Sequence, residues 1–134
     1  MREGSSLAAQ GKRRVFVVDD DEAIVETLQE VLEAEGYDVE GFTDPIRALE
    51  RLRAGDAPDL IVLDCVMPVI DGRRFLEALA EEGRTIPVVL VTALCDPGFC
   101  VDPGHPLAAA LINKPFDLDA LLGTLAGVAG APRP

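Results

Sequence analysis

Runs of apolar residues divide this chain into regular segments. Val15–Val18, Leu60–Leu63 and Ile86–Val91 are almost entirely apolar, which is typical of strands buried on both faces of a sheet. Tyr37–Phe42 alternates between apolar and polar residues and predicts a strand with one exposed face, and Leu111–Ile112 predicts a short strand. The pattern therefore predicts five strands.

Helices are predicted between these strands, where apolar residues recur at helical spacing. One begins near Glu22 and ends at Gly36, and another spans about Arg73–Glu82. A third begins at Asp44-Pro45, because an Asp cap followed by proline is a strong helix start, and the last is capped by Asp117. In chain order, the residues expected on their buried faces are Ile24, Leu28, Val31 and Leu32; Ile46, Leu49 and Leu52; Phe75, Leu76 and Leu79; and Leu118, Leu121, Leu122 and Leu125.

The order of these elements predicts the fold class. Strands that alternate with helices at this spacing predict an α/β fold, in which a doubly wound, five-stranded parallel sheet carries helices on both faces. Right-handed crossovers then bring the carboxyl ends of the strands to one edge of the sheet. We expect this domain to span residues 13–126, with a flexible N-terminal extension at 1–12 and a flexible C-terminal tail at 127–134.

Composition and charge restrict the functional classes. The 134 residues, 49% of them hydrophobic, fit one domain with its own core. A net charge of -12 argues against direct nucleic-acid binding, because phosphate contacts need clustered Lys and Arg. No segment has the length of a membrane span, and no signal peptide is recognisable. We read the three cysteines as reduced thiols and expect a cytoplasmic protein that has no membrane partner.

Polar residues close several of the predicted strands. Asp19 and Asp20 follow the first strand, Asp64 ends the third, Thr92 ends the fourth, and Lys114 follows the last. Because parallel strands end at one edge of the sheet, where open α/β sheets place their ligands, we expect these side chains to share one pocket.

The expected pocket has the groups that phosphoryl transfer needs. Three crowded carboxylates repel, and each raises the pKa of the others unless a cation is present, so the cluster suits a hard divalent ion such as Mg²⁺. Lys114 adds a mobile positive charge that can pair with a carboxylate or a phosphoryl oxygen, and Thr92 adds a hydroxyl donor. A metal, an ammonium and a hydroxyl around a carboxylate stabilise charge during phosphoryl transfer to that carboxylate.

The motifs around these residues resemble those of a known family. They are Val-Val-Asp-Asp at 17–20, Leu-Asp-x-x-Met-Pro-x-x-Asp-Gly at 63–72, Thr92-Ala93, and Lys114-Pro115-Phe116. Each motif is weak alone, but together, in this order and spacing, they are highly specific. From about residue 13 to 126 the chain resembles the receiver domain of response regulators, of the CheY-like chemotaxis type. The resemblance implies a flavodoxin-like (βα)5 sandwich of three layers and a place in a two-component phosphorelay.

The resemblance also implies the role of each acid. Asp64 would be the phosphoacceptor. Asp20 would bind Mg²⁺ directly, and Asp19 would act mainly through water. The backbone carbonyl of Val66 would complete the protein's share of the metal site.

Phosphorylation and signalling follow from the same resemblance. Thr92 would move to bind the phosphoryl group and Lys114 would pair with it, next to a Lys114-Pro115 bond expected to be cis. The domain would not be an enzyme; it would assist only its own phosphorylation and dephosphorylation. Its expected partners are a histidine kinase or histidine phosphotransfer protein and an unidentified downstream protein. We expect a single-domain response regulator that signals by protein–protein contact.

One segment departs from the family pattern. Leu94–Pro106 holds three prolines and two glycines. Prolines inside a helix remove a hydrogen bond and clash with the preceding turn. The fourth helix of the family is therefore expected to be broken, shortened or replaced by a mobile loop.

Two other functions are alternatives. Leu111 stands where receivers typically carry Tyr or Phe, so the usual aromatic gating is not available. This residue and the irregular segment favour a degenerate receiver that acts as a phosphorylation-independent interaction scaffold. A Mg²⁺-dependent phosphatase with an aspartyl nucleophile on its first strand would need Asp-x-Asp-x-Thr/Val, but Glu22 and Ala23 follow Asp21.

The remaining acids and the cysteines have simpler explanations. Asp21 is expected to begin the first helix, and Asp71 to serve the turn with Gly72 and cap the next helix. Cys65 is expected to be a buried thiol whose side chain points away from Asp64. Cys95, Cys100 and His105 are expected to be ordinary loop residues.

Apolar residues near the phosphoacceptor predict a long-lived acyl phosphate. The family pattern implies that Val66 and Leu94 flank the path of the hydrolytic water, and neither can orient it. Val66→Asn is therefore expected to speed dephosphorylation, measured as loss of radiolabel from the phosphorylated protein. An unchanged decay would count against this prediction.

Overall fold

The computed structural model describes residues 13–65, 70, 72–92, 106–114 and 116–129. Strands and helices alternate along most of this part of the chain. In order, they are β1 (Arg14–Val18), α2 (Glu22–Ala34), β2 (Asp38–Phe42), α3 (Pro45–Arg53), β3 (Leu60–Asp64), α4 (Gly72–Glu81), β4 (Val88–Thr92), β5 (Ala108–Asn113) and α5 (Leu118–Ala129).

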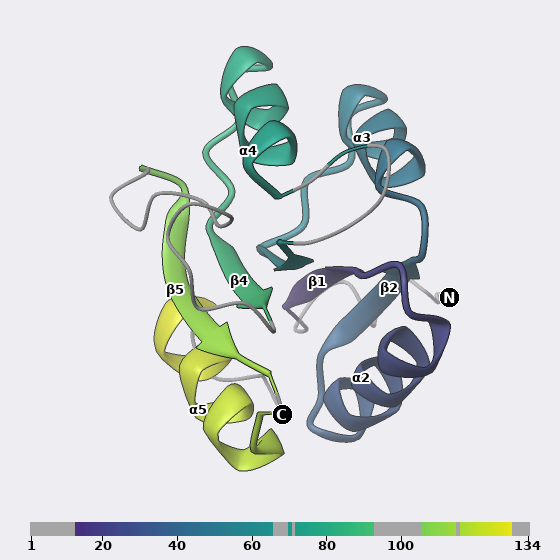
Figure 1. Cartoon of the computed structure of the whole chain (residues 1–134), viewed down its shortest axis with the longest axis vertical. Coiled ribbons are helices and arrows are strands. Elements are labelled where there is room, and N and C mark those ends of the chain that lie inside the picture. The colour runs from purple at the N-terminus through teal and green to yellow at the C-terminus, as the bar shows by residue number, and fades with distance from the viewer. Residues whose placement is uncertain (1–12, 66–69, 71, 93–105, 115, 130–134) are drawn as a thin grey trace.

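The five strands form one parallel sheet in the order β2-β1-β3-β4-β5. Helices α3 and α4 cover one face, and α2 and α5 cover the other (Figure 1). The prediction of a doubly wound α/β sandwich is therefore confirmed. The segment expected to replace the fourth helix falls mainly within residues 93–105, which lie outside the described residues.

The core consists of two apolar layers, one on each side of the sheet. All residues of β3 and β4 are buried, as their continuous apolar runs predict. Successive side chains of a strand point to opposite faces, so Ile61 and Leu63 pack with α3 and α4, whereas Val62 packs with α2 and α5. Two aromatic rings, Phe16 and Phe42, meet in the α3/α4 layer at a centroid distance of 5.0 Å.

Two local predictions need correction. Ile46 is 37% exposed instead of buried, because the inward face of α3 is formed by Pro45, Ala48, Leu49 and Leu52. The last strand, predicted at Leu111–Ile112, begins earlier, at Ala108. Alanine is a weak strand former, but here the pairing with β4 determines the conformation.

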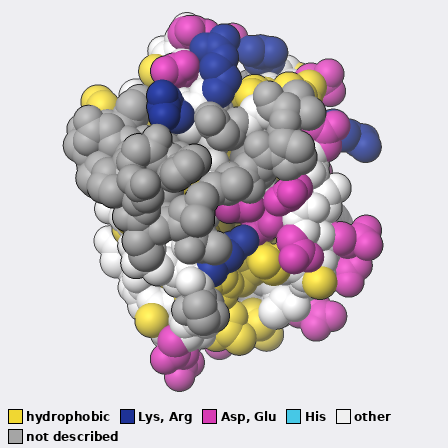
Figure 2. Space-filling view, in the orientation of Figure 1, with side chains coloured by type: hydrophobic (Ala, Val, Ile, Leu, Met, Phe, Trp, Pro, Cys, Tyr) yellow, Lys and Arg dark blue, Asp and Glu magenta, His cyan; other side chains and the backbone are white. Residues whose placement is uncertain are grey.

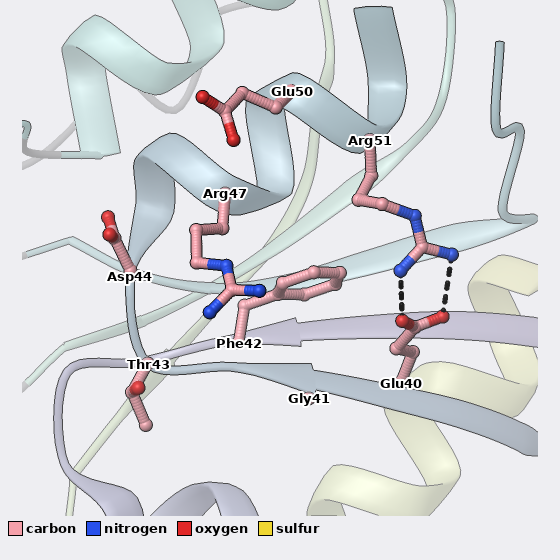
Figure 3. Close-up of a pocket in the computed structure, with 8 residues that line it drawn as sticks. All are labelled: Glu40, Gly41, Phe42, Thr43, Asp44, Arg47, Glu50 and Arg51. Carbon is pink, nitrogen blue, oxygen red and sulfur yellow. Dashed lines mark hydrogen bonds and ion pairs between the residues drawn. The ribbon is translucent and has the colours of Figure 1, made fainter. Parts of the chain in front are cut away.

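An arginine of α3 forms an ion pair with the edge strand β2. The Arg51 guanidinium binds Glu40 through two hydrogen bonds (Figure 3) and donates to Asp56 Oδ2 at 2.7 Å. Its central carbon also lies 5.8 Å from the centroid of the Phe42 ring. The hydrogen bond to Glu40, followed by that to Asp56, raises the pKa of Arg51 above its usual value. The carboxyl end of β2 is therefore held firmly on its α3 side.

The corrected face of α3 can be tested with two substitutions on the same helix. Leu49→Ala is expected to lower the free energy of unfolding by about 2–5 kcal/mol, because Leu49 is buried and its loss leaves a cavity. Ile46→Ala is the matched control and is expected to cost less than about 1 kcal/mol. Urea unfolding followed by circular dichroism measures both, and equal losses would contradict the assignment.

Candidate functional site

Two buried acids lie at neighbouring strand ends. Pairing of Val18 with Leu63 places Asp19 level with Asp64 on the adjacent strand. Asp19 is 3% exposed and Asp64 6% exposed, whereas Asp20 is exposed. Carboxylate oxygens of the three acids lie within 4.8 Å of one another. The structure thus brings together the acidic cluster expected from the sequence, here defined as Asp19, Asp20 and Asp64.

Asp19 is fixed by three hydrogen bonds. Its backbone N–H donates to the Phe42 carbonyl at 3.1 Å. Its Oδ1 accepts the Asp21 N–H at 2.9 Å, and its Oδ2 accepts Lys114 Nζ at 2.9 Å. Asp21 in turn caps α2 by accepting the Ala23 N–H at 3.0 Å, which confirms its expected role as the start of the helix.

Lys114 connects the last strand to the acidic cluster. Its backbone N–H donates to the Thr92 carbonyl at 2.6 Å, and its Nζ lies 3.7 Å from Asp64 Oδ2. Burial acts to lower the pKa of Lys114. The hydrogen bond to Asp19 and the negative charges of Asp19, Asp64 and Asp20 outweigh this effect and raise that pKa above its ordinary value. Lys114 therefore remains a cation at neutral pH.

Thr92 is the last residue of β4 and is completely buried. Because Asp64 pairs with Val91, Thr92 lies one position beyond the phosphoacceptor candidate on the neighbouring strand. All five side-chain candidates of the sequence prediction are therefore at the carboxyl edge of the sheet. Figure 2 shows a group of acidic side chains near the centre of this view with a basic side chain beside it, whereas most of the other basic side chains lie toward the top.

Other predictions have mixed outcomes. Cys65 is buried among the residues that pack with α3 and α4, as expected of a structural thiol. Asp117 caps α5 by accepting the Asp119 N–H at 3.0 Å. Leu111 lies on β5 and is 43% exposed. Several residues to which roles were assigned lie outside the described part of the chain: Val66, Asp71, Leu94, Cys95, Cys100, His105 and Pro115.

The donor set of the acidic cluster fits a hard divalent cation. Carboxylate oxygens are the ligands that Mg²⁺ prefers, and this ion typically takes one or two of them while keeping several waters. Asp20 is exposed, so one side of the cluster is accessible to water. Asp19 and Asp64 are buried, which makes an uncompensated pair of negative charges costly.

Sequence reasoning missed the backbone contacts that place the acids. The Phe42 carbonyl that holds Asp19 comes from β2, and no side-chain motif marks it. Gly72, the first residue of α4, must be glycine because a Cβ there would lie 2.9 Å from Cα of Cys65, the residue that follows β3. Its N–H donates to the Cys65 carbonyl at 2.9 Å. The Asp-Gly pair at 71–72 signals a turn but not this close approach.

A separate hollow lies between β2 and α3 (Figure 3). It has a volume of about 490 Å³ and is open to solvent. Its lining residues are Glu40, Gly41, Phe42, Thr43, Asp44, Arg47, Glu50 and Arg51. None of them belongs to the acidic cluster, so volume alone does not locate the chemistry of this domain.

None of the described helices has the length and apolar character needed to cross a lipid bilayer.

Comparison with known proteins gives relatives for most of the chain. The response regulator MprA of Mycobacterium ulcerans (strain Agy99) is 38% identical over 112 residues, which are 84% of this chain and 48% of that protein. MprA of Mycobacterium avium (strain 104) is 35% identical over 121 residues, or 90% and 53% of the two chains. This chain thus spans about half the length of these curated relatives.

Solved structures of response regulators have the same architecture. The response regulator StyR superposes with a TM-score of 0.79 at 34% identity, covering 88% of this chain and 59% of that one. The chemotaxis protein CheY4 of Vibrio cholerae gives a TM-score of 0.77 at 28% identity, covering 87% and 98%. The sequence model of the family described as the response regulator receiver domain matches residues 15–126 of this chain. With its strand order and acidic cluster, this chain belongs to the response regulator receiver domain family, the CheY-like phosphoacceptor modules of two-component signalling.

Proposed function

We propose that this domain accepts a phosphoryl group on Asp64, with Mg²⁺ held by the acidic cluster, from a histidine kinase or a histidine phosphotransfer protein. One observation carries the proposal: Asp64 is buried at a strand end, in a cluster whose oxygens lie within 4.8 Å of one another. Lys114 Nζ is 3.7 Å from it. This arrangement concentrates negative charge where a divalent cation and an ammonium can compensate it.

Asp64 acts as the nucleophile in the proposed reaction. One of its carboxylate oxygens attacks the phosphorus of a donor phosphohistidine, so that a P–O bond forms and the P–N bond breaks. The imidazole leaves with the electron pair of that bond and takes up a proton. When bound, Mg²⁺ supplies positive charge that offsets the phosphoryl oxygens.

Lys114 and Thr92 respond to the new charge. Lys114 remains protonated at neutral pH and lies within reach of both Asp19 and Asp64. It is therefore placed to pair with a phosphoryl oxygen on Asp64. The hydroxyl of Thr92 is proposed to donate to another phosphoryl oxygen after it moves, and the Val66 carbonyl is proposed to add a metal ligand.

The output is proposed to be contact with another protein or domain, and a scaffold function is the second candidate. Leu111 is 43% exposed on β5 and replaces the aromatic residue typical of receivers. This exposure favours a surface that binds a partner without phosphorylation. The two functions differ in whether occupation of Asp64 changes the protein.

Substitution of Asp64 tests the phosphoacceptor proposal. Acetyl phosphate with Mg²⁺ is expected to add one phosphoryl group to the wild type, located on Asp64 by mass spectrometry. Asp64→Asn is expected to abolish the modification, because an amide is not a comparable nucleophile. Asp38→Asn, at an exposed acid of β2, is the matched control and should be modified normally.

Beryllofluoride extends this test to the scaffold alternative. Addition of beryllofluoride and Mg²⁺ is expected to shift the NMR signals of residues around Asp64. A wild type that neither becomes phosphorylated nor responds would support the scaffold function instead. Modification of Asp19 in place of Asp64 would overturn the assignment of the nucleophile.

Removal of the lysine tests the electrostatics of the metal site. Lys114→Met is expected to tighten Mg²⁺ binding by about fivefold, because one unit charge near the ligands is worth about 1 kcal/mol in water. Calorimetric titration measures this change. Arg53→Met, which removes the same charge from the last turn of α3, is the control and should leave the affinity unchanged. Weaker Mg²⁺ binding by Lys114→Met would contradict the proposed competition.

A further inference from the structure

Gly41 of β2 leaves space that α2 occupies. A Cβ atom at this position would lie 2.3 Å from Cγ1 of Val25 and 3.3 Å from Oε1 of Gln29. Real Cβ atoms essentially never approach a neighbour below 3.0 Å, so any side chain here would force a shift. The described glycines with positive φ are Gly36, Gly55 and Gly83. Glycine is therefore required at 41 for space and not for backbone conformation.

At Gly41, helix α2 lies close against the sheet. Helix α2 packs more extensively on β2 than on β1. Val25 is 6% exposed and belongs to the apolar layer beneath the helix. In such a close-packed layer an added methyl group cannot be absorbed without moving its neighbours. A side chain at 41 would therefore displace the first turns of α2.

Val25 is linked directly to the acidic cluster. Its backbone N–H donates to the Asp21 carbonyl at 3.1 Å, the first hydrogen bond of the helix. The N–H of Asp21 donates to Asp19 Oδ1 at 2.9 Å. The N–H of Asp19 donates to the carbonyl of Phe42, the residue after Gly41, at 3.1 Å. These contacts form a closed ring that begins and ends at the carboxyl end of β2.

The β2 side of this ring is held in place. Arg51 fastens Glu40 and packs against Phe42, so β2 is restrained on the side away from α2. Strain from a side chain at 41 is therefore directed toward α2 and the Asp19–Asp21 segment. Asp20 lies in the connection between β1 and α2, and no strand in the described part of the chain pairs with it.

We propose that Gly41 is a positioning residue for the metal site. By letting Val25 approach β2, it sets the place of the Asp19–Asp21 segment and thus of two of the three carboxylates that would hold Mg²⁺. This inference rests on the proposed function, since it concerns the same metal site. It assigns a role to a residue that contacts neither the metal nor the phosphoryl group.

The test is Gly41→Ala, with Mg²⁺ affinity measured by calorimetry and backbone amide shifts by NMR. We expect Mg²⁺ affinity to fall by about tenfold, the lower end of the effect of residues that orient metal ligands. In the metal-free protein, the amide signals of Asp21 and Ala23 should shift, because the Asp21 N–H is in the ring and the Ala23 N–H donates to the Asp21 side chain. Gly123→Ala on α5 is the matched control, because its Cβ would meet nothing within 4 Å. It should leave both measurements unchanged.

A compensating substitution separates positioning from general loss of stability. Val25→Ala removes Cγ1, so Gly41→Ala should have little effect on Mg²⁺ affinity in that background. A double variant that binds Mg²⁺ several-fold more weakly than Val25→Ala would overturn the proposal. So would a Gly41→Ala protein that is less stable but binds Mg²⁺ as the wild type does. If Gly41→Ala alone does not fold, the comparison of the double variant with Val25→Ala still decides the matter.

The same measurements distinguish failure of this inference from failure of the proposed function. Absence of Mg²⁺ binding by the wild type would refute the proposed metal site. Wild-type binding together with an unaffected Gly41→Ala would refute only the role of Gly41. The metal-free amide shifts of Asp21 and Ala23 test the ring without any metal.

Discussion

Two buried carboxylates repel each other, and the other groups of the site must offset that repulsion. Asp19 and Asp64 are almost fully buried at the ends of adjacent strands, where water cannot screen them well. Lys114 supplies one compensating charge, and the Asp21 N–H supplies a fixed donor. These donors come from a helix start and from the end of the last strand. The correct placement of both depends on completion of the whole parallel sheet.

The sequence predicts this arrangement well where one feature determines one element. The central strands are recognisable because burial on both faces demands a continuous apolar run. The site is recognisable because Asp19, Asp64 and Thr92 each follow such a run, and parallel topology brings the ends together. These inferences need only local sequence and one rule of topology.

Features determined by contact between distant elements were beyond sequence reasoning. Ile46 fits a helical apolar pattern, but the direction in which α3 docks leaves it exposed. Ala108 begins a strand because β4 offers a pairing partner, although its propensity does not favour one. A glycine such as Gly41 is unfavourable inside a strand, and only the position of Val25 in the fold explains why glycine is needed there.

Lys114 lies closer to one of its two acids than to the other, and this difference bears on the proposed signalling. Its ammonium is 2.9 Å from Asp19 but 3.7 Å from Asp64, so in the resting state it is bound mainly to the residue that is not the proposed phosphoacceptor. In the proposed reaction, a phosphoryl group on Asp64 would therefore compete with Asp19 for this cation. Under that proposal, phosphorylation would change how one positive charge is shared between two anions. Because the Lys114 N–H also donates to the Thr92 carbonyl at the end of β4, a movement of Lys114 in that exchange would act on this strand as well.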